Sequence, residues 1–150
     1  MKTMTMSLIG IAFTAASALA LDQPLIDNLM TSAQNIERDA NAMHDTLRNK
    51  NAGSADISAK LDAIGGDVTK MHELVSQFEA TSPNLSQRDR EDWNLLKEKV
   101  KLIEIFHGQK SKLAADNLDR NRGLIRAHAK GVALRAAKLQ QTAAKLRRGA

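Results

Sequence analysis

The chain of 150 residues contains no cysteine and no tyrosine, and only four residues are aromatic. The absence of cysteine excludes disulfides, thiolate chemistry and the covalent attachment of c-type haem. The scarcity of aromatic side chains argues against a β-sandwich, whose strands favour them, and against a stacking platform for single-stranded nucleic acid. The fold must therefore be held together by the packing of aliphatic side chains.

Acidic residues are absent from the last part of the chain. The segment from Arg120 to Ala150 carries nine bases and no acid, whereas the segment from Leu21 to Asp92 carries thirteen acids and seven bases. Such asymmetry indicates either an anionic partner or an internal acidic complement. The candidate residues for contact with an anionic surface are Arg126, Lys130, Arg135, Lys138, Lys145, Arg147 and Arg148.

Three interpretations of the basic segment stay open. The basic helix could lie beside the acidic first half and neutralise it, through exposed pairs that contribute about 0–1 kcal/mol each. It could instead face acidic lipid, polysaccharide or an acidic protein, where a basic residue near an acidic membrane contributes about 1 kcal/mol. Contact with nucleic acid is the third interpretation, and it is disfavoured because no recognition motif is present.

The first twenty residues have the layout of an export signal. Lys2 supplies a short positive start, Ser7 to Ala16 is an apolar run, and Ala18 and Ala20 are the small residues that signal peptidase requires. We predict a signal peptide over residues 1–20, cleaved after Ala20, and a periplasmic or secreted mature protein. The apolar run is shorter than the ~20 residues that span a bilayer. We also expect no membrane-spanning segment in the mature chain.

Apolar residues recur at alternating steps of three and four in four stretches of the mature chain. The four series begin at Ile26, Ile57, Trp93 and Ile125. A repeat sustained over this length places one apolar stripe along each helix, and no segment shows the alternation of a strand. The sequence therefore predicts an all-α fold.

Capping and breaking residues divide the mature chain into four predicted helices. Their ranges are 24–50, 55–80, 86–117 and 122–148. Pro24 suits a first helical position, Pro83 ends the second helix, and Ser86 with Asp89 resembles a capping box. Short connections make neighbouring helices antiparallel, so we expect a single domain over 21–150 that forms an up-down-up-down four-helix bundle. The alternative is a pair of long helical hairpins that associate between chains as a coiled coil.

Two features within the helical stretches allow more than one interpretation. The third connection falls either at 116–123, which is rich in poor helix formers, or at 108–111. The first choice gives helices of comparable length and is preferred for that reason. Gly65 and Gly66 lie inside the second helix, where each glycine costs about 1 kcal/mol relative to alanine, and they mark a kink or a close helix contact.

Histidines are the main candidates for a transition-metal site. His44, His107 and His128 fall within about one helical turn of each other in height if the third connection lies near residue 119. No HExxH or His-x₃-His pattern occurs, so a metal would have to be held between helices. The simpler interpretation is that these histidines lie at the edge of the core, because helical bundles recruit metals with carboxylate–histidine sets that this sequence lacks.

The layout of the chain also resembles that of small periplasmic four-helix b-type cytochromes. The resemblance rests on the export signal, the mature length, Met30 early in the first helix and His128 in the last segment. It implies haem b held between Met30 and His128, provided that the third connection falls at Gly108. Catalytic motifs are missing: the chain has no GxSxG sequence and no phosphate-binding loop. We therefore expect a non-catalytic interaction module of the cell envelope or exterior, with a haem- or metal-binding bundle as the alternative.

Overall fold

The computed structural model describes residues 22–81 and 84–148, and residue 148 is described by its backbone alone. The predicted signal peptide over 1–20 lies outside these ranges. The described residues form three helices: α1 (Gln23–Thr46), α2 (Ser54–Thr81) and α3 (Gln87–Arg148). The prediction of an all-α fold is confirmed. None of these helices is long and apolar enough to cross a membrane.

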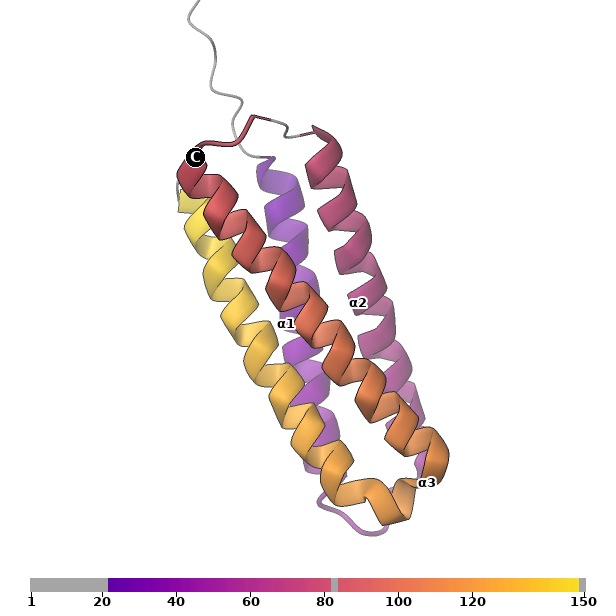
Figure 1. Cartoon of the computed structure of the whole chain (residues 1–150). Helices are drawn as coiled ribbons and strands as arrows, with labels where there is room; N and C mark the ends of the chain where they lie inside the picture. Colours follow the sequence, from indigo (N-terminus) through magenta and orange to yellow (C-terminus); the bar gives the residue numbers. More distant parts are fainter. Residues whose placement is uncertain (1–21, 82–83, 149–150) are drawn as a thin grey trace, which may run out of the picture.

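The prediction of four separate helices in an up-down-up-down bundle is wrong. The predicted helices 86–117 and 122–148 both belong to α3, a single element of 62 residues. Only Asn117 leaves the helical conformation inside it, with φ −160° and ψ 105°. We call residues 87–116 the first arm of α3 and residues 118–148 the second arm. α3 folds back at Asn117, so that the two arms lie side by side (Figure 1).

The other helix ends are close to the predicted ones. Asp22 accepts a hydrogen bond from the backbone N–H of Leu25 at 3.3 Å, with Pro24 in the first turn of α1. Ser86 caps α3, because its Oγ accepts from the N–H of Asp89 at 3.1 Å and donates to the Asp89 carboxylate at 2.6 Å. Side-chain oxygens at these positions satisfy N–H groups that have no partner within the helix. α1 ends at Thr46, four residues before the predicted end at residue 50.

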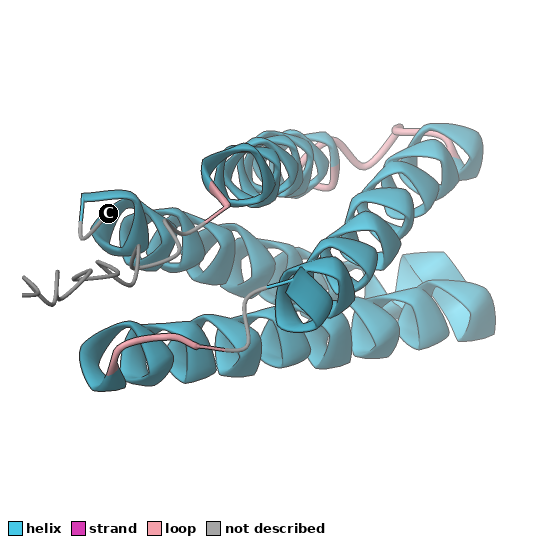
Figure 2. Cartoon of the chain, turned by 90° about the horizontal axis from the view of Figure 1, so that it is seen from above, coloured by secondary structure: helices cyan, strands magenta, loops and turns pink. Residues whose placement is uncertain are grey.

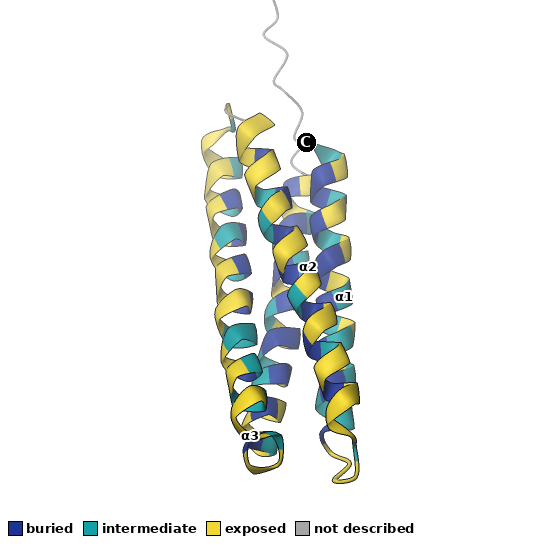
Figure 3. Cartoon of the chain, turned by 90° about the vertical axis from the view of Figure 1, so that its right-hand side faces the viewer, coloured by how far each residue is buried: buried dark blue, intermediate teal, exposed yellow. Residues whose placement is uncertain are grey.

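The apolar stripes face a common interior. Viewed from above, α1, α2 and the arms of α3 surround it (Figure 2), and the buried residues line the inner side of every helix (Figure 3). Phe78 and Trp93 stack with ring centroids 4.0 Å apart, which joins α2 to the first arm. Ala129, Ala136 and Ala143 of the second arm are fully buried. Small residues at these positions allow a close approach of neighbouring helices.

Candidate functional site

The second arm of α3 carries the predicted basic residues on its outer side. Arg126, Lys130, Lys138 and Lys145 are exposed, as is Arg147. The side chain of Arg148 lies outside the described residues. The apolar positions of the same arm point inward, so burial of the stripe turns the charged residues toward solvent.

Ion pairs between the second arm and the acidic helices are few. Among the described residues, the only predicted basic side chain that reaches a carboxylate is Arg147, whose Nε lies 3.3 Å from Asp27 Oδ1 of α1. The second arm also contacts a carboxylate of α1 through an uncharged side chain, since Gln140 Nε2 donates to Glu37 Oε2 at 2.6 Å. Direct neutralisation of the acidic first half therefore accounts for one of the predicted basic residues, Arg147.

Arg135 differs from the other predicted residues because it folds over the seam between the arms. Its Cζ lies 3.6 Å from the centre of the Phe106 ring, at cation–π distance. Its Nη1 donates to the carbonyl of Gly131 at 3.0 Å. A Cβ atom at Gly131 would lie 3.1 Å from that Nη1 atom, so the glycine leaves room for the guanidinium group.

A groove runs along the seam beside Arg135. It has a volume of about 290 Å³ and is lined by Lys99 and Leu102 of the first arm and by Leu134, Arg135 and Lys138 of the second. Leu102 is 43% exposed and Leu134 is 55% exposed. The groove therefore combines accessible apolar side chains with three cations, and no carboxylate lines it.

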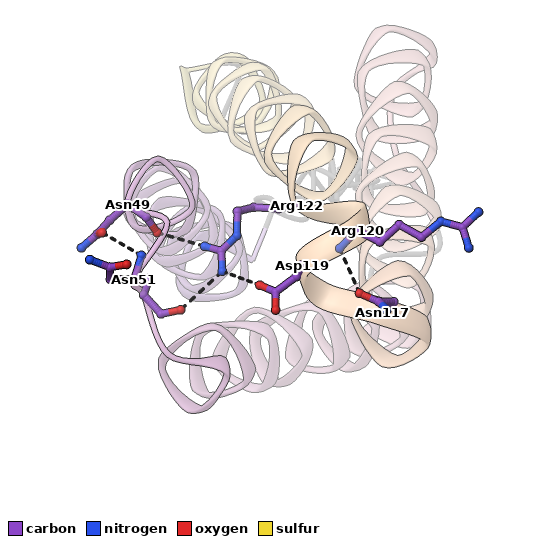
Figure 4. A network of polar contacts seen from close by, with 7 residues as sticks. Asn49, Asn51, Asn117, Asp119, Arg120 and Arg122 are labelled. Carbon is purple, nitrogen blue, oxygen red and sulfur yellow. Dashed lines mark hydrogen bonds and ion pairs between the residues drawn. The ribbon is translucent and has the colours of Figure 1, made fainter.

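The position of the second arm is fixed at the chain reversal. The Asn117 side chain accepts a hydrogen bond from the backbone N–H of Arg120 at 2.9 Å, as an N-cap residue does. Arg122 donates to the carbonyl of Asn49 at 3.0 Å and forms an ion pair with Asp119 at 2.9 Å (Figure 4). The α1–α2 connection and the start of the second arm are thereby joined by one guanidinium group.

The predicted histidine site is not assembled. His44 Nδ1 lies 3.1 Å from the neighbouring Asp45, His107 faces a cavity between α2 and the first arm, and His128 packs 5.6 Å from the Phe106 ring. Within 22–81 and 84–148, no group of three or more metal-binding side chains is placed to hold an ion. The three histidines thus occupy three different environments.

The condition for the haem arrangement is also not met. Gly108 lies in a helical stretch of the first arm, and the chain reverses at Asn117 instead. Met30 packs at the margin of the core near the start of α1, whereas His128 contacts Phe106 at the seam of α3. The geometry that the resemblance requires therefore does not form around this pair of residues.

Two ionisable residues, His107 and Lys110, fall in the apolar stripe of the first arm. Continuing the repeat of the first arm from Ile103 in steps of four and three reaches His107 and Lys110. Lys110 is fully buried and its Nζ has no hydrogen-bond partner among the described residues. Burial lowers the pKa of Lys110 to about 8. It also lowers the pKa of His107 to about 4, assisted by the Lys110 ammonium and opposed by Asp62.

His107 borders a cavity of about 410 Å³ between α2 and the first arm, which Asp62 and Ser111 also line. Of the two explanations for the glycine pair, a kink or a close contact, Gly65 fits the close contact, since a Cβ atom there would lie 3.2 Å from His107 Nε2. Ser111 donates its hydroxyl proton to the carbonyl of His107 at 3.0 Å. Its Oγ is 3.5 Å from the imidazole Nε2, at the outer limit of a hydrogen bond. This arrangement does not prepare the serine as a nucleophile.

Comparisons with known proteins give no family for this chain. No family model matches it, and neither the curated proteins nor the solved structures contain a significant match.

Proposed function

We propose that this protein is an exported, non-catalytic interaction module that binds an anionic surface through the outward face of the second arm of α3. The observation that supports the proposal is the scarcity of internal partners for its cations. Of the predicted basic residues whose side chains are described, only Arg147 pairs with a carboxylate. Arg126, Lys130, Lys138 and Lys145 are exposed and have no carboxylate within ion-pair distance among the described residues.

The physical basis is the arrangement of like charges on one rigid element. The second arm has no acid after Asp119, so no carboxylate of the arm itself opposes the cations on its outward face. Exposed lysines keep most of their hydration until an anionic partner approaches, and each then contributes about 1 kcal/mol near an acidic surface. Salt screens interactions of this kind, with a Debye length of about 8 Å at physiological ionic strength.

The proposal is tested by removing charge from this face alone. The triple variant Lys130→Gln, Lys138→Gln, Lys145→Gln changes three exposed residues of the second arm. The matched control, Lys70→Gln, Lys101→Gln, Lys112→Gln, removes the same charge from exposed positions on α2 and the first arm. Retention on heparin and binding to phosphatidylglycerol vesicles are measured as functions of salt.

We expect the second-arm variant to bind its anionic partner about a hundredfold more weakly than the unmodified protein, which is the effect of three contributions of about 1 kcal/mol. The control variant should keep most of the binding. Added salt should weaken the binding of the unmodified protein and of the control variant. Equal losses in the two variants would mean that net charge alone decides, and the proposed face would then be wrong. Absence of binding to both probes at low salt would also contradict the proposal.

A further inference from the structure

The basic face is not purely polar, because large apolar side chains lie exposed beside its cations. Leu95 and Leu102 are 41% and 43% exposed, and their spacing of seven residues places both on one side of the first arm. Leu134 is 55% exposed on the second arm. Leu102 and Leu134 meet in the groove at the seam of α3, so residues from both arms form one accessible apolar strip.

The ionisable side chains that line the groove between the arms are all cations. Lys99 and Lys138 line the groove from opposite arms, and Arg135 lies at the same seam on the Phe106 ring. On the first arm, the exposed Glu98 lies one helical turn from Leu102 but does not line the groove. Glu91 and Asp92 border a neighbouring hollow together with Arg88 and Lys145. The groove thus presents leucines to an apolar group and cations to an anionic one.

We propose that the anionic surface is a lipid membrane, into which Leu102 and Leu134 insert while Lys99 and Lys138 bind lipid phosphates. This inference rests on the proposed function and names its partner. A helical surface with apolar residues on one strip and cations beside it lies in the plane of the membrane interface. The long side chains of the lysines reach the headgroups while their methylene stems cover the apolar strip.

Other anionic partners use only part of this surface. A sulfated polysaccharide or a nucleic acid binds through its charges and gives the leucines no apolar environment. A second copy of the chain would place two acid-free second arms against each other, and like charges disfavour that contact. Acyl chains and phosphates in one partner are the combination that matches both the leucines and the lysines of the groove.

The test separates insertion from attraction. The variant Leu102→Gln, Leu134→Gln keeps every charge and changes two exposed side chains of the groove. The control Leu124→Gln removes another exposed apolar side chain, 56% exposed, that lies ten residues before Leu134 and does not line the groove. Co-sedimentation with phosphatidylglycerol–phosphatidylcholine vesicles and retention on heparin are measured for both variants, with circular dichroism as the check on folding.

We expect the groove variant to lose about tenfold or more in vesicle binding, with heparin retention unchanged, and the control to bind vesicles nearly as the unmodified protein does. Unchanged vesicle binding by the groove variant would overturn the inference and leave the proposed function standing. Binding to heparin without binding to vesicles would also overturn it, in favour of a polysaccharide. If the unmodified protein binds neither probe, both proposals fail. A sedimenting dimer that the groove variant dissociates would assign the leucines to self-association and overturn the inference.

Discussion

The two arms of α3 follow the same three-four repeat but fill it with different side chains. The first arm uses large residues such as Trp93 and Ile103, and then interrupts its stripe with His107 and Lys110. The second arm alternates large residues such as Ile125 and Leu139 with alanines, and Ala129, Ala136 and Ala143 are fully buried. The same spacing thus carries mainly large side chains, then His107 and Lys110, in the first arm, and large side chains alternating with alanine in the second.

This difference has a counterpart in the packing. α3 as a whole packs more extensively on α1 than on α2, and the cavity of about 410 Å³ lies on the α2 side, next to His107. Polar residues in a stripe give up apolar area, whereas alanine preserves contact by shortening the distance between helices.

Truncation of a large residue should be most harmful in the first arm. Trp93→Ala removes a side chain that is 3% exposed and stacked on Phe78. We expect the free energy of unfolding to fall by about 3–5 kcal/mol, as for other buried aromatic residues replaced by alanine. Urea unfolding followed by circular dichroism measures the change. Leu95→Ala, at an exposed position of the same arm, is the control, and an equal loss there would show that the stripe does not carry the difference.

Removal of the buried charge should stabilise the protein. Lys110 has a pKa of about 8 in the folded chain, below the ordinary value of 10.5. Between these values the unfolded chain holds the proton more tightly, so the free energy of unfolding should rise as the pH increases from about 8 to about 10.5. Lys110→Met should remove this rise and add on the order of 3 kcal/mol at pH 7. Urea titrations at several pH values test both statements, and a less stable variant would reveal a partner for the ammonium group.

Enlargement should be the harmful change in the second arm. Ala136 is fully buried, and Ala136→Leu adds three carbon atoms where helices approach closely. We expect a loss of about 1–3 kcal/mol from overpacking. The same substitution at the exposed Ala127 should change the stability little. A stabilising effect at residue 136 would show unfilled space there and would remove the contrast between the arms.

The smallest effect is expected at the residue that joins the arms. Asn117→Ala removes the side-chain oxygen that caps the second arm, and we expect a loss of about 1 kcal/mol. Asn117→Gly should cost only a few tenths of a kcal/mol, because glycine is itself accepted at helix N-caps. Thermal unfolding of the two variants compares them directly, and an alanine variant as stable as the glycine variant would show that the cap contributes nothing.

Much of the helical fold was predictable from residue spacing, because burial of an apolar stripe dominates the packing of each helix. The continuity of α3 was not. The stretch from Asp116 to Gly123 is rich in poor helix formers and suggested a break of several residues. In the structure, Asn121 Nδ2 donates to the carbonyl of Leu113 at 2.9 Å and satisfies a group that the reversal leaves free. The Asn117 cap and the Asn121 side chain thus satisfy backbone groups on both sides of the single non-helical residue.

The candidate site also has features that could be predicted from the sequence and features that could not. The basic residues follow from composition, and Lys110 could have been found by extending the repeat beyond His107. The groove could not, because Leu102 and Leu134 are 32 positions apart in the sequence. Their meeting depends on how one arm is aligned along the other, and that alignment is set at Asn117 and Arg122. Local sequence patterns do not contain this information.

The contact between Arg122 and the carbonyl of Asn49 joins residues 73 positions apart. During synthesis, the connection between α1 and α2 exists long before the arginine that binds it. The inner side of α1 is likewise synthesised before α3, the helix on which α1 packs most extensively. A nascent chain that ends before the reversal at Asn117 therefore lacks the second arm and cannot complete the core. Cooperative folding is expected only after the second arm has been synthesised.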